Sequence, residues 1–255
     1  MTHRLSALIF DVDGTLAETE RDGHRVAFNE SFMAHSLNWF WSDGLYGELL
    51  KITGGKERLA HFIEHYQPDM PNGMPIETLI NTLHQEKNKR YLQILQAGKI
   101  PLRPGVLRLL NAARNSGVKL AIATTTTLEN VHHLLSCTLS SDAINWFDVI
   151  AAGDVVAAKK PAPDIYFYAL EKLQLPANEC VAIEDSANGL QAALQAELTT
   201  LITLNDYTAN ENFTGAALVV NQLGEPDAPC QAIAGSMGGS NCVDLALFNR
   251  LINRE

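Results

Sequence analysis

The stretch LSALIFDVDGT, residues 5–15, places a mostly apolar run directly before two aspartates, Asp11 and Asp13, which are separated by one valine. A short continuous apolar run bounded by turn-forming residues is typical of a fully buried β-strand. Gly14 follows the second aspartate and permits a tight turn. The stretch therefore predicts a buried strand that brings two carboxylates to one edge of a sheet.

Further apolar runs of the same kind recur along the chain as VKLAIAT, FDVIAAG, CVAIED and TTLITL. Between the later runs lie stretches with helical spacing of apolar residues, namely GVLRLLNAARNSG, DIYFYALEKLQL and ANGLQAALQAE. Strands that alternate with helices in this way predict an α/β fold, in which a parallel sheet is covered by helices on both faces. Sheets of this kind bind ligands beyond the carboxyl ends of their strands.

The first two predicted strands are separated by about eighty residues, far more than one crossover helix needs. This segment contains several helical patterns, among them HRVAFNESFMAHSLNWF, KERLAHFIEHY and IETLINTLHQEKNKRYLQILQ. We therefore predict an inserted all-helical domain over residues 17–98 and an α/β core formed by residues 1–16 and 99–225. Residues 226–255 begin with a Gly-, Pro- and Ser-rich stretch and predict a tether that leads to a C-terminal helix.

Composition and charge narrow the range of partners. The chain has 255 residues and a formal net charge of −10, which argues against nucleic acid and anionic membranes as partners. No stretch approaches the roughly 20 apolar residues that a membrane span requires. The four cysteines contain no CxxC pair, so they predict reduced thiols rather than a zinc site or a disulfide framework. We expect a cytoplasmic protein.

Polar residues follow four of the predicted strands, at the point where each strand ends. These residues are Asp11, Asp13, Thr124, Thr125, Thr126, Thr127, Lys159, Lys160, Glu184 and Asp185. Because the carboxyl ends of parallel strands meet at one edge of a sheet, we expect these side chains to converge on one rim. Each residue alone has an ordinary structural explanation, such as helix capping by Asp185. Together, however, they form a set of hydroxyl groups, a cation and carboxylates that can bind a metal.

The ordered set DVDGT, AIATTTT, KKPAPDIY and IEDSANG is similar to the four motifs of the haloacid dehalogenase-like phosphatase superfamily. More narrowly, ETERDGHRVAFN, LYGELLKITGGKER and AGDVVAAKKPAPDIY resemble the CbbY branch of that family. The branch includes xylulose-1,5-bisphosphate phosphatases, which protect Rubisco by destroying an inhibitory product. The resemblance runs from about residue 5 to about residue 220. It implies a Rossmann-like α/β core with a central parallel sheet between helices, and an inserted helical cap of the family's first type.

The resemblance also implies roles for the rim residues. Asp11 would attack phosphorus and form an aspartyl-phosphate, while Asp13 would protonate the leaving alkoxide and then deprotonate the attacking water. Lys160, which directly precedes a proline as in the family motif, would neutralise the developing charge, and Thr124 would hold the transferring phosphoryl group. Thr125 and Thr126 are further candidate substrate contacts. The expected cofactor is Mg²⁺, with Asp11, the backbone carbonyl of Asp13, Asp185 and, as a weaker outer ligand, Glu184.

The stretch TGGKER in the predicted helical domain presents Lys56 and Arg58 after two glycines. One interpretation is that these cations bind the distal phosphate of a bisphosphate. The alternative is that they open a helix and pair with Glu57 or Glu64 on a solvated face. Further candidate substrate contacts are Glu18, His24 and Lys87, although His24 could also be an ordinary surface histidine.

The leading prediction is a Mg²⁺-dependent phosphatase that hydrolyses a sugar bisphosphate, xylulose-1,5-bisphosphate, as a monomer with a functional link to Rubisco metabolism. One alternative is a phosphohexomutase of the β-phosphoglucomutase type, which shares the four core motifs. Others are a phosphoglycolate phosphatase-like hydrolase and a catalytically silent binding module, although the latter predicts the loss of a core residue and none is lost. Asp13 argues for phosphate chemistry, since the family members that cleave carbon–halogen bonds lack this aspartate.

Overall fold

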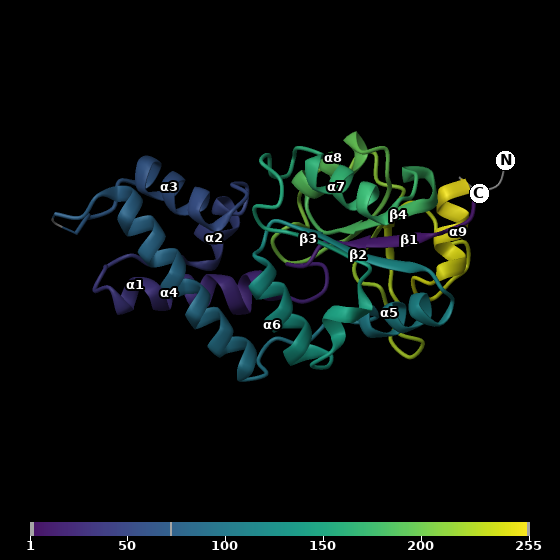
Figure 1. Ribbon diagram of the computed structural model, residues 1–255, viewed down its shortest axis with the longest axis horizontal. Helices are drawn as coiled ribbons and strands as arrows, with labels where there is room; N and C mark the ends of the chain where they lie inside the picture. Colours follow the sequence, from purple (N-terminus) through teal and green to yellow (C-terminus); the bar gives the residue numbers. More distant parts are fainter. Residues whose placement is uncertain (1–2, 72, 254–255) are drawn as a thin grey trace. The chain divides into compact units, whose positions relative to one another are not determined.

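The computed structural model describes residues 3–71 and 73–253. Contacts between residues divide the chain into two compact units. The larger unit contains the described residues up to Ala17 and those from Leu102 onward, and the smaller unit is Glu18–Pro101. In Figure 1 the smaller unit carries the labels α1 to α4, and the larger one carries the strands.

The larger unit is built on a seven-stranded sheet with the order β3-β2-β1-β4-β5-β6-β7. The strands are β1 Ala7–Phe10, β2 Lys119–Thr124, β3 Val149–Ala152, β4 Cys180–Glu184, β5 Thr199–Thr203, β6 Leu218–Val220 and β7 Ala232–Ala234. All neighbouring pairs are parallel except β6 and β7, which pair antiparallel. The apolar run of β1 is fully buried, as its central place between β2 and β4 requires. The predicted α/β fold with a mostly parallel sheet is confirmed.

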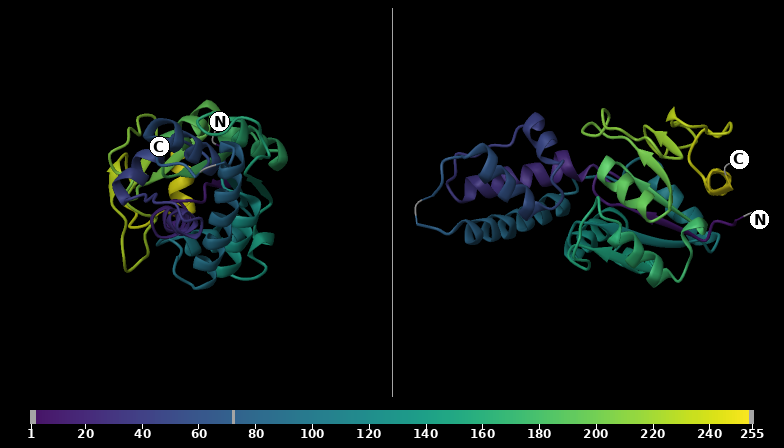
Figure 2. Two further views of the ribbon diagram at one scale, coloured as in Figure 1. Left: turned by 90° about the vertical axis from the view of Figure 1, so that its left-hand side faces the viewer. Right: turned by 90° about the horizontal axis from the view of Figure 1, so that it is seen from above.

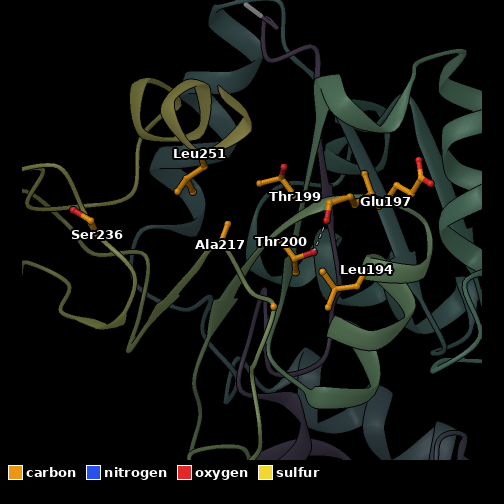
Figure 3. Close-up of a pocket in the computed structure, with 9 residues that line it drawn as sticks. Leu194, Glu197, Thr199, Thr200, Ala217, Ser236 and Leu251 are labelled. Carbon is orange, nitrogen blue, oxygen red and sulfur yellow. Dashed lines mark hydrogen bonds between the residues drawn. The ribbon is translucent and has the colours of Figure 1, made fainter. Parts of the chain in front are cut away.

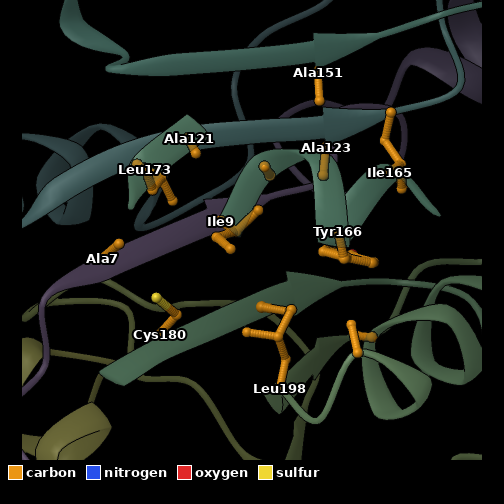
Figure 4. Close-up of a cluster of buried hydrophobic side chains, with 14 of the residues drawn as sticks. Ala7, Ile9, Ala121, Ala123, Ala151, Ile165, Tyr166, Leu173, Cys180 and Leu198 are labelled. Atoms are coloured by element: carbon orange, nitrogen blue, oxygen red, sulfur yellow. The ribbon is translucent and has the colours of Figure 1, made fainter. Parts of the chain in front are cut away.

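Helices cover both faces of this sheet. They are α5 Val106–Asn115, α6 Leu128–Thr138, α7 Asp164–Leu173, α8 Ala187–Gln195 and α9 Leu245–Asn253, with short 3-10 turns at Ala143–Trp146 and Ala177–Glu179. Figure 1 shows α7 and α8 on one face and α5 on the other. Alternate strand residues such as Ala7 and Ile9 point to the same face, where they pack against Tyr166 and Leu173 of α7 (Figure 4).

The C-terminal segment differs from its prediction as a tether and a helix. Residues Ala232–Ala234 form β7, which pairs with β6 and extends the sheet by one antiparallel strand. All three side chains are exposed, so the buried apolar run that predicts the other strands is missing here. The helix α9 is present as predicted and packs against α5 and β4.

Helices are the only regular secondary structure in the described residues of the smaller unit. It contains a π-helical turn, Glu20–His24, followed by α1 Arg25–Ala34, α2 Asp43–Leu49, α3 Gly55–Tyr66 and α4 Ile76–Gln96. The right-hand view of Figure 2 shows α1 and α4 side by side, and these two helices make the most extensive contact within the unit. None of the helices in the described parts of the chain combines the length and the apolar character that crossing a bilayer demands.

An aromatic cluster forms the centre of this helical unit. Trp41 is fully buried, with its ring centroid 4.6 Å from Phe28, 5.1 Å from Phe32 and 5.4 Å from Phe62. Aromatic pairs at such distances stabilise a core beyond the burial of their area. Trp41 therefore joins α1 and α3 through the loop that precedes α2.

Trp41→Ala is expected to lower the free energy of unfolding of the helical unit by about 3–5 kcal/mol, because it leaves a large cavity among aromatic rings. Urea denaturation followed by far-ultraviolet circular dichroism measures the change. Phe40→Ala is the matched control, since Phe40 is 67% exposed and its loss should change stability by no more than about 0.5 kcal/mol. Equal effects of the two substitutions would contradict the proposed core.

Candidate active site

The central strands bring the predicted catalytic carboxylates to one rim of the sheet. Phe10 of β1 pairs with Ile122 of β2 and Ile183 of β4, and the Asp11 N–H donates to the Ile183 carbonyl at 3.0 Å. Asp11 therefore emerges beside Glu184, one residue further along β4. Parallel strand pairing thus makes Asp11 and Glu184 neighbours in space, although they are far apart in the sequence.

Lys160 lies between two of these carboxylates. Its Nζ donates to Asp11 Oδ1 at 2.7 Å, to Glu184 Oε1 at 2.5 Å and to the Ala123 carbonyl at 2.8 Å. Burial lowers the pKa of Lys160, but the charges of Asp11 and Glu184 outweigh this effect and hold the pKa above its ordinary value. Lys160 is therefore a buried, charged ammonium group, whereas the adjacent Lys159 pairs with Asp154 at 3.3 Å.

Three carboxylates crowd around this single ammonium group. Asp11, Glu184 and Asp185 are all buried, and each has an oxygen within 4.8 Å of the others. Burial raises the pKa of Asp11 to about 8, against the opposing charge of Lys160. Burial and the charge of Asp11 likewise raise the pKa of Asp185 well above its usual range. Hard carboxylate oxygens with excess negative charge fit a divalent cation such as Mg²⁺, and Asp11 and Asp185 could hold it.

Glu184 is bound mainly by the protein itself. Its Oε1 accepts from Lys160 and also from the Tyr166 hydroxyl at 2.5 Å, while its Oε2 accepts from the Asp185 N–H at 3.3 Å. A Cβ at Gly189 would lie 2.0 Å from Glu184 Oε2, so α8 packs directly on this carboxylate. These contacts suit a residue that holds Lys160 in place. The weaker, outer role of Glu184 as a metal ligand stays a prediction.

The turn after Asp13 packs against Asp185. Gly14 has φ +81°, and a Cβ there would lie 2.3 Å from Asp185 Oδ2, so only glycine fits this turn. Asn205 Nδ2 donates to the same oxygen at 2.6 Å. The alternative that Asp185 caps the following helix is wrong, because Ser186 is the N-cap of α8 and accepts from the Gly189 N–H at 3.1 Å.

Asp13 lies close to Asp11 and is only partly buried. Its charge contributes to the raised pKa of Asp11, while the intervening Val12 is buried. Alternation along the chain thus places both carboxylates at the rim and the valine in the core. An accessible carboxyl beside a buried one suits a group that exchanges protons with a ligand.

The threonine run Thr124–Thr127 forms the entry to α6. Thr124 is buried, and its Oγ1 accepts from the Thr126 N–H at 3.2 Å. Thr127 is the N-cap of α6 and accepts from the Asn130 N–H at 3.3 Å. The Thr126 hydroxyl accepts from Asn130 Nδ2 at 3.3 Å. Thr124 adjoins the carbonyl that binds Lys160, whereas Thr127 has a structural role.

The predicted contacts Glu18, His24, Lys56, Arg58 and Lys87 all belong to the helical unit. Arg58 is buried, and it donates to the Tyr46 hydroxyl at 3.0 Å and to the Leu49 carbonyl at 3.1 Å. Its guanidinium also lies 4.0 Å from Glu20. The alternative that Arg58 pairs on a solvated face is therefore wrong, although Lys56 and Glu57 are exposed. Glu18 is half-buried at the start of the unit.

Positive groups gather around His84, which the sequence analysis did not single out. Burial lowers the pKa of His84 to about 4, and the charges of Lys87 and Lys56 lower it further. Lys87 is buried, with its Nζ 5.3 Å from the ring centroids of both Phe28 and Tyr91. His24 is also buried, 4.0 Å from the Tyr91 ring, so the interpretation of His24 as a surface residue is wrong.

A separate pocket of about 770 Å³ opens at the amino end of β5 (Figure 3). Its lining includes Thr199, Thr200, Ser236 and Leu251. The carboxylates and Lys160 lie beyond the opposite, carboxyl ends of the strands. This pocket is therefore distinct from the candidate active site.

Comparison with known proteins agrees with this geometry. Residues 5–197 match a family model described as haloacid dehalogenase-like hydrolase. Protein CbbY of Rhodobacter capsulatus is 50% identical over 212 residues, which is 83% of this chain and 91% of that protein. The crystal structure of CbbY from Rhodobacter sphaeroides with phosphate is 47% identical, with a TM-score of 0.80, and covers 86% of this chain and 94% of its own. A structure of its aspartate-to-asparagine variant with xylulose-1,5-bisphosphate gives the same score and coverage at 46% identity.

The crowded carboxylates predict how metal binding and stability depend on pH. The pKa of Asp11 is about 8 in the folded, metal-free protein and 3.8 in the unfolded chain. The contribution of Asp11 to stability is therefore fully present below pH 3.8 and is lost as the pH rises through about 8. Since metal ligands must be deprotonated, the increase in Tm caused by Mg²⁺ should grow from about pH 6 to about pH 9. Thermal melts with Mg²⁺ or EDTA across this range measure both effects.

Asp154→Asn is the matched control for this experiment, because the Asp154 side chain is 87% exposed. It should retain the Mg²⁺ response, whereas Asp185→Asn should lose it. A Tm increase of the same size at every pH, or one that survives Asp185→Asn, would contradict the assignment of the metal site.

Proposed function

Because this chain belongs to the haloacid dehalogenase-like hydrolase family, we propose that it is a Mg²⁺-dependent phosphatase whose substrate is xylulose-1,5-bisphosphate. The enzyme class follows from the family and from relatives at 45–50% identity over most of the chain. The substrate is supported by the solved CbbY of Rhodobacter sphaeroides that contains this compound.

The observation that carries the proposal is the position of Asp11 in the ion pair with Lys160. A carboxylate that attacks phosphorus must be held in one orientation and must not be repelled by the phosphate. Lys160 meets both needs, since it contacts Asp11 Oδ1 at 2.7 Å and is anchored on its other side by Glu184. Bound Mg²⁺, held by Asp11 and Asp185, would supply further positive charge against the same repulsion.

The proposed reaction has two steps on this chain's own residues. In the first, an oxygen of Asp11 forms a bond to phosphorus, the phosphoester bond breaks, and Asp13 gives its proton to the departing sugar oxygen. In the second, Asp13 takes a proton from water as that water attacks the aspartyl-phosphate, which releases inorganic phosphate and restores Asp11. Lys160 stabilises the negative charge that develops in both steps.

The second phosphate of the substrate is assigned to the cations of the helical unit. The protein carries a net charge of −10, so an anionic ligand requires a locally positive surface. Lys56, Lys87 and Arg58 provide such charges. Burial is the main cause of the low pKa of His84, and the charges of Lys87 and Lys56 lower that pKa further. Arg58 is oriented by Tyr46 and Leu49, which reduces the entropy it would lose on binding an anion.

Incubation of the protein with xylulose-1,5-bisphosphate and Mg²⁺ tests the proposed function. We expect one equivalent of inorganic phosphate to be released per bisphosphate, and much slower release from 2-phosphoglycolate. Conversion of β-glucose 1-phosphate to glucose 6-phosphate, without stoichiometric phosphate release, would instead indicate a mutase. Faster release from 2-phosphoglycolate would identify a phosphoglycolate phosphatase.

Asp11→Asn is expected to abolish turnover, because an amide is a poor nucleophile and a poor metal ligand. Asp13→Asn should lower kcat by roughly 10²–10⁴-fold, the usual contribution of general acid–base catalysis. Phosphate release by steady-state kinetics measures both, with circular dichroism to verify the fold. Activity of Asp11→Asn within about tenfold of the wild type would refute the nucleophile assignment, since the nucleophile makes the first bond.

Lys56→Ala and Arg58→Ala should each lower kcat/KM for the bisphosphate by about tenfold to a hundredfold, since a hydrogen bond to a charged group contributes about 1.5–3 kcal/mol. The same variants should hydrolyse p-nitrophenyl phosphate, which has no second phosphate, at nearly the wild-type rate. Lys56 is exposed, so its loss tests anion binding with little effect on the fold. Equal losses on both substrates would show that these residues do not recognise the distal phosphate.

A further inference from the structure

A second buried cation lies at the same rim as the candidate site and has no part in the reaction described above. Arg103 is 6% exposed. Its Nη1 donates to the Gly14 carbonyl and, at 3.5 Å, to the Thr203 carbonyl. Its Nη2 donates to the Leu204 carbonyl and, at 3.2 Å, to that of Asn221. The guanidinium thus binds backbone carbonyls at or just beyond the carboxyl ends of β1, β5 and β6.

This arrangement depends on the shape of the arginine side chain. A planar guanidinium offers five donors in a rigid fork, whereas a lysine ammonium is a compact charge on a flexible stem. A buried charge is tolerated only where its donors are satisfied. Arg103 therefore holds three segments of the rim in one fixed arrangement, and no lysine could contact all four carbonyls at once.

The most important of these carbonyls belongs to Gly14, next to the proposed proton donor. The Gly14 N–H donates to the Ala17 carbonyl at 2.9 Å, and the Gly14 carbonyl accepts from Arg103. The peptide groups on both sides of Gly14 are therefore fixed. Arg103 is itself tied to this turn, since its N–H donates to the Leu16 carbonyl at 2.8 Å.

We propose that Arg103 is a positioning residue that aims the Asp13 carboxyl at the leaving group by holding the Gly14 carbonyl. The proposal rests on the function proposed above. Asp11 does not depend on Arg103 in the same way, because β4 and Lys160 hold it through the contacts to the Ile183 carbonyl and to Oδ1. Loss of Arg103 should therefore impair proton donation more than nucleophilic attack.

The chain offers a matched control in Arg108. Its Nη2 also donates to three backbone carbonyls, those of Leu223, Gly224 and Val243, at 2.7–3.2 Å. Its Nε lies 3.3 Å from Glu225. Arg108 thus holds chain segments by the same chemistry, but the carbonyls it binds all belong to the C-terminal part of the chain.

The test compares Arg103→Lys, Arg103→Gln and Arg108→Lys on two substrates. Xylulose-1,5-bisphosphate releases a strongly basic alkoxide that needs a proton, whereas p-nitrophenyl phosphate releases a stable phenolate that does not. For the Arg103 variants, kcat/KM should fall by about tenfold to a hundredfold on the bisphosphate and by less than about threefold on p-nitrophenyl phosphate. Arg108→Lys should lower Tm and leave both kcat/KM values unchanged.

A double-mutant cycle with Asp13→Asn provides the second readout. The loss caused by Arg103→Lys on the bisphosphate should largely disappear in the Asp13→Asn background, because the positioned group is already absent. Equal losses on both substrates, full additivity with Asp13→Asn, or the same substrate dependence in Arg108→Lys would each overturn the proposal. A wild-type protein that hydrolyses neither substrate would refute the proposed function itself. Circular dichroism and Tm show which of the two Arg103 variants keeps the native fold, and the kinetic comparison uses that variant.

Discussion

A buried lysine shared by two carboxylates is the interaction on which the candidate site depends. Lys160 follows β3, whereas Asp11 and Glu184 come from the central strands β1 and β4. Because an isolated buried charge is costly, each of the three requires the others. Their mutual satisfaction fixes the loop after β3 against the rim, and Tyr166 of α7 completes it by donating to Glu184. The same contacts orient Asp11, which its proposed role as the nucleophile requires.

The ion pair leaves negative charge in excess, and this excess explains why the site suits a cation. Asp185 adds a third carboxylate, and burial raises its pKa as it does that of Asp11. Repulsion between the ionised carboxylates therefore destabilises this cluster at neutral pH when no cation is bound. A divalent cation relieves the repulsion and allows the carboxylates to remain ionised. The electrostatics of the fold therefore favour a cation at this rim.

Charge is distributed unevenly within this acidic chain. The rim of the sheet is rich in carboxylates. The helical unit holds Arg58 and Lys87 over aromatic rings, and the charge of Lys56 acts on His84. The net charge of −10 averages over this difference and conceals it. An anionic substrate is therefore compatible with an acidic protein, because recognition depends on local potential and not on total charge.

The sequence by itself determined the α/β fold, the helical insert and the identity of the rim residues. Buried strands such as Ala7–Phe10 are continuous apolar runs, and the polar residues that follow them, Asp11 above all, mark the carboxyl ends of a parallel sheet. The local sequence pattern is sufficient to predict these strands and the residues that follow them. The spacing of apolar side chains indicates a strand or a helix, and the first polar residue after it marks where the element ends.

Only the tertiary structure decided how these residues are held. The contact between Lys160 and Asp11 joins residues 149 positions apart, and the role of Arg103 depends on carbonyls from three strand ends. Backbone carbonyls are present at every residue, so the sequence contains no sign of which ones a guanidinium will bind. The strand β7 is a similar case, since its exposed residues become a strand only through pairing with β6. Proximity in space creates these interactions, and no local pattern encodes it.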